Sequence, residues 1–243
     1  MPLPRAVLAL ALPFAALPAL PAAAIVGGGD AEPAGAVMVL NSAGGVCTGV
    51  VVAPDAVLTA GHCVAGAKAL RVHYRSTEGA PVLVDIAART VHPGYDAGAV
   101  AGRRRSIDLA LLRTAEPLPP RFAPASLGTQ EPRAGETLTL AGYGAAKPGD
   151  PRSTGTYRSV AVPVVEPYGP SRILVWMQGS RGTGACQGDS GGPVAPPDGT
   201  VLAVTAWIGG GCGGLTQAIR LAPQRDWIDR TLSGWGLAAR WRP

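Results

Sequence analysis

Glycine and proline occur so often in this chain that they limit its fold before any motif is considered. Among 243 residues, 34 are glycine and 24 are proline, a proportion just below the range that indicates disorder when it occurs without a period. A disordered chain, however, does not carry 47 % hydrophobic residues, because that much apolar surface must be buried. Only short apolar segments fit between so many turns, so we expect an all-β protein rather than a helical bundle.

Apolar and alternating runs of 4 to 10 residues recur along the chain, each bounded by Gly, Pro, Asp or Ser, which is typical of strands joined by turns. The first series consists of Val46–Val52, Val57–Ala60, Leu70–Tyr74, Val82–Val91 and Leu109–Leu112. The second consists of Thr137–Tyr143, Tyr157–Val165, Ile173–Gln178, Val201–Ile208 and Leu215–Leu221. The proline-rich stretch Glu116–Pro124 separates the two series and cannot join a central strand, so we expect two β units.

Near the C-terminus the pattern becomes helical. Between Pro223 and Leu232, Trp227 and Ile228 lie on one face and charged residues on the other, and proline suits the first turn of a helix. The predicted units are therefore residues 25–120 and 121–222 for the two β units and 223–243 for a helix with its tail.

The first 24 residues have the features of a secretory signal peptide. Arg5 precedes an apolar stretch over Ala6–Leu20, and small residues lead up to Ala24, which is the expected order of charged, apolar and cleavage regions. The alternative is a membrane anchor, but a stretch interrupted by Pro13 and Pro18 is short for a bilayer that requires about 20 residues. We expect cleavage after Ala24, a secreted or periplasmic protein, and no membrane contact afterwards.

Export makes the cysteines informative, because an oxidising compartment favours disulfides over metal or redox chemistry. Four cysteines allow three pairings, and no Cys-x-x-Cys is present. The spacings favour two local bonds, Cys47–Cys63 and Cys186–Cys212, each worth on the order of 3 kcal/mol. We expect no metal site, since the histidines are dispersed and His73 and His92 are interpreted as structural.

The formal net charge is +5, and 15 % of the residues are charged, which excludes a coiled coil, an acidic tail or a nucleic-acid arm. Of the 21 basic residues only Lys68 and Lys147 are lysine, a bias that fits a GC-rich genome. The single basic cluster, Arg103–Arg105, is interpreted as an exposed loop rather than a nucleic-acid or heparin contact. No acidic loop has calcium-ligand spacing, so we expect no cofactor.

The densest chemical signal is the segment Gly188–Pro193, with the sequence GDSGGP. A serine among glycines allows backbone N–H groups to approach a substrate carbonyl, because no side chain blocks them. The pattern also fits the nucleophile elbow of α/β-hydrolases, in which the histidine follows the serine. Here all three histidines precede Ser190, so the order disfavours a lipase or an esterase.

Two further motifs each supply one more candidate catalytic residue. Leu58–Cys63 ends a predicted strand with His62, and Ile107–Leu112 places Asp108 directly before an apolar strand. With His62, Asp108 and Ser190 in this order, the chain resembles the trypsin/chymotrypsin-like serine endopeptidases, as a bacterial-type secreted member. The resemblance extends from roughly Ile25 to Leu232, and the motifs around His62 and Ser190 are highly specific to that family.

The resemblance implies two antiparallel six-stranded β-barrels with a C-terminal α-helix, and a site in the cleft between the barrels. It implies that Ser190 attacks the scissile carbonyl, that His62 is general base and then general acid, and that Asp108 orients the imidazole. The N–H groups of Gly188 and Ser190 would form the oxyanion hole, worth about 3–4 kcal/mol per donor. Expected partners are protein or peptide substrates and, as a further candidate, a protein inhibitor; we expect a monomer.

The family also suggests how the chain is activated. Ile25–Gly28 matches the mature N-terminus of family members, whose α-ammonium pairs with the Asp before the nucleophile, here Asp189. Since the expected signal-peptidase site directly precedes Ile25, export itself would create the active N-terminus.

The substrate pocket departs from the trypsin pattern. The residue six before the nucleophile lines the base of the pocket in this family, and here it is Gly184, which cannot pair with Lys or Arg. Thr205–Gly209 resembles the strand that binds substrate backbone and includes Trp207. Ala206 replaces a serine that usually bonds to the catalytic Asp, and Ile208 replaces a glycine that keeps the pocket open.

We expect cleavage after small or medium apolar residues. The alternative is a catalytically weak or silent homologue that acts as a binding module.

Overall fold

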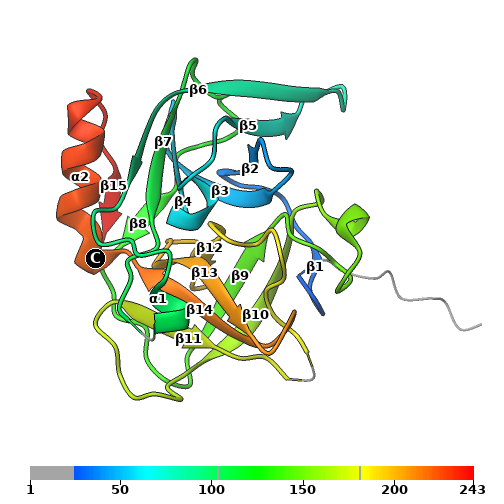
Figure 1. Cartoon of the computed structure of the whole chain (residues 1–243), viewed down its shortest axis with the longest axis vertical. Helices are drawn as coiled ribbons and strands as arrows, with labels where there is room; N and C mark the ends of the chain where they lie inside the picture. The colour runs from blue at the N-terminus through cyan, green and yellow to red at the C-terminus, as the bar shows by residue number, and fades with distance from the viewer. Residues whose placement is uncertain (1–24, 103, 181) are drawn as a thin grey trace, which may run out of the picture.

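Two closed β-barrels, each of six antiparallel strands, make up most of the molecule, as predicted (Figure 1). The computed structural model describes residues 25–102, 104–180 and 182–243. The predicted signal peptide and Arg103 of the basic cluster lie outside the described residues. Within the described part, no helix has the length and apolar character needed to cross a membrane.

The first barrel closes in the order β2-β3-β4-β7-β6-β5. Its strands are β2 (Ala36–Asn41), β3 (Val46–Ala53), β4 (Ala56–Thr59), β5 (Leu70–Arg75), β6 (Pro81–Val91) and β7 (Ala110–Thr114). A four-residue helix, α1 (Ala99–Gly102), lies in the connection from β6 to β7. The predicted runs cover five of these strands, and β2 is the one that they omit.

The second barrel follows the order β10-β11-β14-β13-β12-β9 and closes by pairing β9 with β10. Its strands are β9 (Thr137–Gly142), β10 (Arg158–Val165), β11 (Leu174–Met177), β12 (Pro193–Ala195), β13 (Ala203–Gly209) and β14 (Leu215–Arg220). Here the predicted runs omit β12, because it is short and directly follows the serine motif.

The N-terminal segment does not pack on the barrel that follows it directly in the sequence. β1 (Gly29–Asp30) pairs with β10 of the second barrel, and Ile25 is fully buried in the core of that barrel. The N-terminal segment therefore packs on the second barrel, whereas the predicted division grouped it with the first. This crossing brings the N-terminal segment to the serine-bearing half of the molecule.

The predicted C-terminal helix is present: a 3-10 turn over Ala222–Gln224 leads into α2 (Arg225–Gly234). The tail after it forms β15 (Arg240–Arg242), which runs parallel to β8 (Ser126–Gly128) in the connection between the barrels. In Figure 1 the helix lies at the left of the view beside the first barrel, although it follows the last strand of the second barrel in the sequence.

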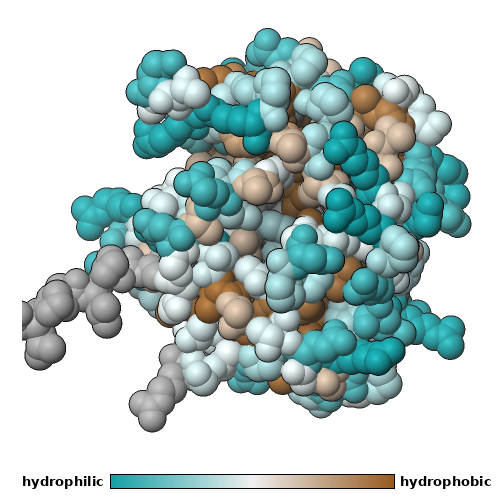
Figure 2. All heavy atoms as spheres, turned by 180° about the vertical axis from the view of Figure 1, so that it is seen from behind, coloured by the Kyte–Doolittle hydropathy of each residue, from teal (hydrophilic) through white to brown (hydrophobic). Residues whose placement is uncertain are grey.

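One apolar cluster joins the two barrels to the helix. It includes Leu58 and Leu111 from the first barrel, Val204 and Ile219 from the second, and Ile228 from α2, all fully buried. Burial of each such side chain stabilises the fold by about 1.5–3 kcal/mol. The barrels are thus held in a fixed mutual position, and Figure 2 shows apolar side chains deep between the two lobes of the surface.

Candidate active site

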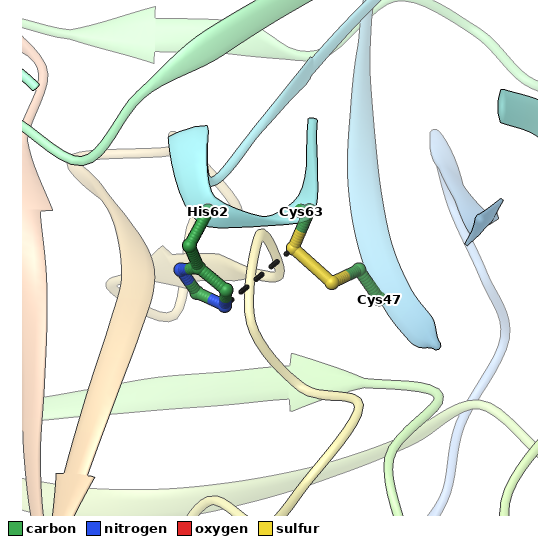
Figure 3. Close-up of side chains that lie close together, drawn as sticks. All are labelled: Cys47, His62 and Cys63. Carbon is green, nitrogen blue, oxygen red and sulfur yellow. Dashed lines mark hydrogen bonds between the residues drawn. A yellow bond between two sulfur atoms is a disulfide. The ribbon is translucent and has the colours of Figure 1, made fainter. Parts of the chain in front are cut away.

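His62 lies where β4 ends, in a 3-10 turn over Gly61–Cys63. The neighbouring Cys63 is buried and forms a disulfide with Cys47 of β3, so the turn is fastened to the barrel wall (Figure 3). The His62 side chain is 38 % exposed, which leaves its outer ring nitrogen accessible from the surface.

Asp108 reaches His62 because of the strand register. β4 pairs with β7 so that Thr59 lies opposite Ala110, which places the residues just beyond these strand ends side by side. Oδ1 of Asp108 accepts a hydrogen bond from the His62 backbone N–H at 2.8 Å, and Oδ2 lies 2.7 Å from Nδ1. Packing around Gly61 is tight, because a Cβ there would lie 3.0 Å from Asp108 Oδ1 and 3.1 Å from the Leu109 carbonyl oxygen.

Ser190 is held against the first barrel by its own backbone. Its carbonyl oxygen accepts a hydrogen bond from the Thr48 N–H at 2.8 Å and lies 4.0 Å from the Sγ of Cys63. The next residue, Gly191, has φ of +86°, and a Cβ there would lie 2.0 Å from the Thr48 carbonyl oxygen. Only glycine permits this approach, which brings the serine beside the turn that carries His62.

The described residues contain no hydrogen bond between Ser190 Oγ and His62. Nε2 of His62 lies instead 3.7 Å from the Sγ of Cys63, as Figure 3 shows. The structure therefore brings all three predicted residues to one place, with His62 and Asp108 directly bonded. Nucleophile–base contacts are often loose in substrate-free enzymes and tighten in the complex.

The grouping of Cys47, His62 and Cys63 places one ligand atom from each within 4.8 Å of the others. Both sulfur atoms are bonded to each other in the disulfide, so neither is available as a thiolate ligand. The residues do not fit a metal ion, and the disulfide itself explains the cluster.

The loop before the nucleophile has the backbone shape that an anion-binding hole needs. Gly188 has φ of +99°, and a Cβ there would lie 2.8 Å from the Cα of Gly144. Within the described part of the chain, the N–H groups of Gly188 and Ser190 donate to no acceptor. Two unengaged N–H groups two residues apart can donate to a negatively charged substrate oxygen.

Asp189 is buried beneath this loop and is 1 % exposed. Its two carboxylate oxygens accept hydrogen bonds from the backbone N–H groups of Gly144 and Cys186, each at 2.8 Å. Burial raises the pKa of Asp189 to about 7, although these two bonds and the charge of Arg158 oppose the increase. A nearby cation would stabilise the ionised form of a carboxyl group buried in this way.

The N-terminal segment runs next to the loop that holds Asp189. Val26 forms an antiparallel bridge with Gly184, and the Gly184 N–H donates to the Val26 carbonyl oxygen at 3.0 Å. Ile25 and Ala185 are both fully buried in the same apolar cluster. A group at the position of Ile25 is therefore close in the fold to the loop that leads to Asp189.

The predicted pocket residues come from the 184–186 segment and β13. Ala206 is buried at a bulge in β13, and Ile208 packs partly buried against the second-barrel core. Trp207 is half-buried, and its ring lies 6.3 Å from that of Trp176. The disulfide Cys186–Cys212 joins the segment that contains Gly184 to the loop between β13 and β14. That loop approaches Gly184 closely, because a Cβ built on Gly184 would lie 3.4 Å from the Cα of Gly213 and 3.5 Å from the carbonyl oxygen of Gly214.

Thr216 is a pocket candidate that the sequence reasoning missed. It lies directly opposite Ile208 in the β13–β14 pair and is 1 % exposed. The signal that identifies it is the strand register, which sequence motifs do not show. Two branched side chains at one register position lie side by side on the same face of the sheet and together fill the space over that face.

Two surface hollows of about 260 Å³ each lie on the second barrel. One is lined by residues that include Glu131, Trp176 and Arg220, and the other by residues that include Gln130 and Leu202. Neither hollow includes His62, Asp108 or Ser190.

Comparisons with known proteins agree with this geometry. The family described as Trypsin matches residues 25–228. Human kallikrein-8 is 26 % identical over 205 residues, covering 79 % of this chain and 78 % of its own. Trypsin zeta of Drosophila melanogaster is 30 % identical over 217 residues, covering 77 % of this chain and 74 % of its own.

A solved structure shows the same fold. It is described as neuropsin, a serine protease expressed in the limbic system of mouse brain. It superimposes with a TM-score of 0.72 at 24 % identity and covers 85 % of this chain and 99 % of its own. From the extent of the family match, we conclude that this chain belongs to the trypsin family of serine proteases.

Proposed function

We propose that this chain is a secreted serine endopeptidase in which His62, Asp108 and Ser190 form the catalytic triad. The observation that carries the proposal is the pair of bonds from Asp108 to the backbone and ring of His62. These bonds set the tautomer, because a carboxylate beside Nδ1 keeps the proton on Nδ1 and leaves Nε2 free to act as a base.

The reaction would proceed in two balanced halves. Ser190 Oγ attacks the scissile carbonyl carbon while its proton passes to Nε2 of His62. The carbonyl electron pair moves to oxygen, where the N–H groups of Gly188 and Ser190 stabilise the negative charge. As the carbonyl re-forms, the C–N bond breaks and the amine takes the proton from His62, which leaves an ester on Ser190. Water then attacks the ester by the same route and restores the serine.

For specificity, we propose cleavage after small or medium apolar residues. Gly184 supplies no charge for a basic side chain, and Ile208 faces Thr216 across paired strands. A hydrophobic pocket discriminates by about 1–3 kcal/mol for each methylene group that does not fit. Strong preference for Arg or Lys in a peptide library would contradict this part of the proposal.

For activation, we propose that cleavage after Ala24 creates an α-ammonium at Ile25 that pairs with Asp189. The raised pKa of the buried Asp189 and the bridge from Val26 to Gly184 support this. Secretion or periplasmic export belongs to the same proposal. The expected bacterial-type character stays a prediction, because the relatives compared above are animal proteins.

A direct test compares hydrolysis of an alanyl or valyl peptide amide by the secreted protein and by its Ser190→Ala variant. We expect turnover by the first and a loss of at least about 10³-fold in the second. A folded, correctly processed protein without Ser190-dependent hydrolysis would favour the binding-module alternative. Ala206 and Ile208 are the features that support this alternative. Ala206 cannot donate the hydrogen bond that a serine there would give to Asp108, and Ile208 stands where a glycine would keep the substrate pocket open.

A further inference from the structure

We propose that Thr48 is a positioning residue that holds the oxyanion loop, Cys186–Ser190, in its anion-binding shape from the opposite barrel. The inference rests on the proposed function, because it assigns a role in stabilising the charged intermediate. It concerns a residue outside the triad, the loop and the substrate pocket.

The side chain of Thr48 makes two hydrogen bonds that fix its polarity. Thr48 lies in β3 and is fully buried. Its Oγ1 donates to the Gly188 carbonyl oxygen at 2.9 Å and accepts from the Tyr143 N–H at 2.9 Å. A carbonyl can only accept and a backbone N–H can only donate, so the single hydroxyl proton must point to Gly188.

The backbone of Thr48 holds the other half of the same loop. Its N–H donates to the Ser190 carbonyl oxygen at 2.8 Å, and its carbonyl oxygen accepts from Thr59 Oγ1 at 2.7 Å. One residue therefore fixes the carbonyl groups of both residues whose N–H groups would bind the oxyanion. These carbonyl groups belong to the peptide planes that follow Gly188 and Ser190, so Thr48 fixes both residues on their C-terminal side. The planes that carry the two oxyanion N–H groups are held on their other side, by the Ala145 N–H on the Gln187 carbonyl oxygen and the Gly192 N–H on the Asp189 carbonyl oxygen, each at 2.8 Å.

This restraint matters because it acts from the opposite barrel, whereas the other backbone hydrogen bonds of the loop come from residues of the second barrel, such as the Asp189 N–H to the Cys186 carbonyl oxygen at 3.1 Å. Gly188 has no side chain and adopts φ of +99°, a region that glycine enters and leaves readily. The Tyr143 N–H bond adds a second restraint, because the neighbouring Gly144 N–H donates to Asp189 at 2.8 Å. The Thr48 hydroxyl thus fastens both segments that surround Asp189 to the first barrel.

Thr48 also sets where the loop lies relative to His62. It directly follows Cys47, which is bonded to Cys63 beside His62. The turn that carries His62 and the oxyanion loop are consequently both attached to the same short segment of β3. Misplacing a preorganised donor weakens transition-state stabilisation more than ground-state binding, so the effect is expected in kcat rather than KM.

The test compares Thr48→Val, which keeps the shape and removes the hydroxyl, with Thr48→Ser, which keeps the hydroxyl. Rates are divided by the number of sites that a fluorophosphonate labels at completion. We expect Thr48→Val to lower kcat by about 10- to 100-fold with KM within twofold. Affinity for a peptide boronate, which forms a tetrahedral adduct on Ser190, should fall in parallel, and Thr48→Ser should remain within about threefold of wild type.

Thr114→Val is the matched control. Thr114 is also buried in the first barrel and donates one hydrogen bond, to the Glu116 carbonyl oxygen at 2.7 Å, but it does not contact the oxyanion loop. We expect this variant to lose stability and to keep wild-type kcat per labelled site. Should Thr48→Val not fold, Thr48→Ala carries the same expectation in kcat.

Wild-type kcat in a folded Thr48→Val or Thr48→Ala protein would overturn the role of Thr48 alone. An equal loss in Thr48→Ser and Thr48→Val would also overturn it, because the γ-methyl rather than the hydroxyl would then matter. Absence of Ser190-dependent labelling in the wild-type protein would overturn the proposed function and, with it, this inference.

Discussion

Asp108 and His62, 46 residues apart in the chain, are joined by two hydrogen bonds, one to each carboxylate oxygen. Oδ1 accepts from the His62 backbone N–H at 2.8 Å and Oδ2 lies 2.7 Å from Nδ1. The ring orientation therefore does not depend on contact with Ser190, and a base is available before substrate arrives.

Replacement of Asp108 by Asn is expected to lower kcat by roughly 10⁴-fold with little loss of stability. The amide still accepts the backbone bond, but its N–H₂ group facing Nδ1 favours the wrong tautomer. Steady-state kinetics and circular dichroism measure the two effects. Asp85→Asn, which removes an exposed ion pair with Arg71 in the same barrel, should leave kcat unchanged, and a fall of less than 10-fold in Asp108→Asn would contradict the assigned role.

The raised pKa of Asp189 predicts a pH dependence that differs between forms of the protein. In a form extended before Ile25, the folded pKa of about 7 exceeds the ordinary 3.8. The native state then binds the proton more tightly than the unfolded state, so the free energy of unfolding decreases as pH rises from about 4 to about 7. The full shift corresponds to at most about 4 kcal/mol.

In the form that begins at Ile25, the α-ammonium should keep Asp189 ionised. The free energy of unfolding should then no longer decrease as pH rises from about 4 to about 7. Urea unfolding of both forms between pH 4 and pH 8 measures the difference. Asp189→Asn in the extended form should remove the slope as well. Identical pH profiles for the two forms would contradict pairing of the N-terminus with Asp189.

Widening the space opposite Thr216 should change specificity. With Ile208→Gly, we expect kcat/KM for phenylalanyl substrates relative to alanyl substrates to rise by about 10- to 100-fold. Ile208→Val, which keeps a branched side chain, serves as the control and should change the ratio by less than about fivefold. A ratio that does not respond to Ile208→Gly would mean that this side chain does not limit the pocket.

The C-terminal tail is expected to stabilise the joint between the barrels without affecting catalysis. Trp241 packs against the cluster that joins the barrels, donates from Nε1 to Asp229 Oδ1 at 2.8 Å, and lies 5.2 Å from the Arg225 guanidinium. Trp241→Ala should lower the free energy of unfolding by about 2–3 kcal/mol, measured by urea denaturation. Trp241→Phe should recover about half of that loss, and kcat should be unchanged in both variants.

Much of this molecule could be predicted from local sequence because its strands are short and bounded by turn residues. The residues that the predicted runs omit are informative. β12 has only three residues, so it is too short to show the period that distinguishes a strand. The pairing of β1 with β10 and of β15 with β8 depends on long-range packing, which no local pattern encodes.

The residues of the candidate site also differ in how far the sequence alone predicts them. His62, Asp108 and Ser190 stand in distinctive motifs, so the sequence identified them. Thr48 and Thr216 stand in ordinary strand sequence, and their positions follow only from register and from contacts between the barrels. Residues that act through backbone geometry leave little trace in composition or spacing.

The central claim, that Ser190 is the nucleophile of an endopeptidase, is tested most directly by fluorophosphonate labelling of the secreted protein followed by peptide mass mapping. We expect one adduct, on Ser190, in protein that begins at Ile25, with no labelling in Ser190→Ala and labelling slowed by at least about 10³-fold in His62→Ala. Folded protein beginning at Ile25 that takes up no label on Ser190 would contradict the claim.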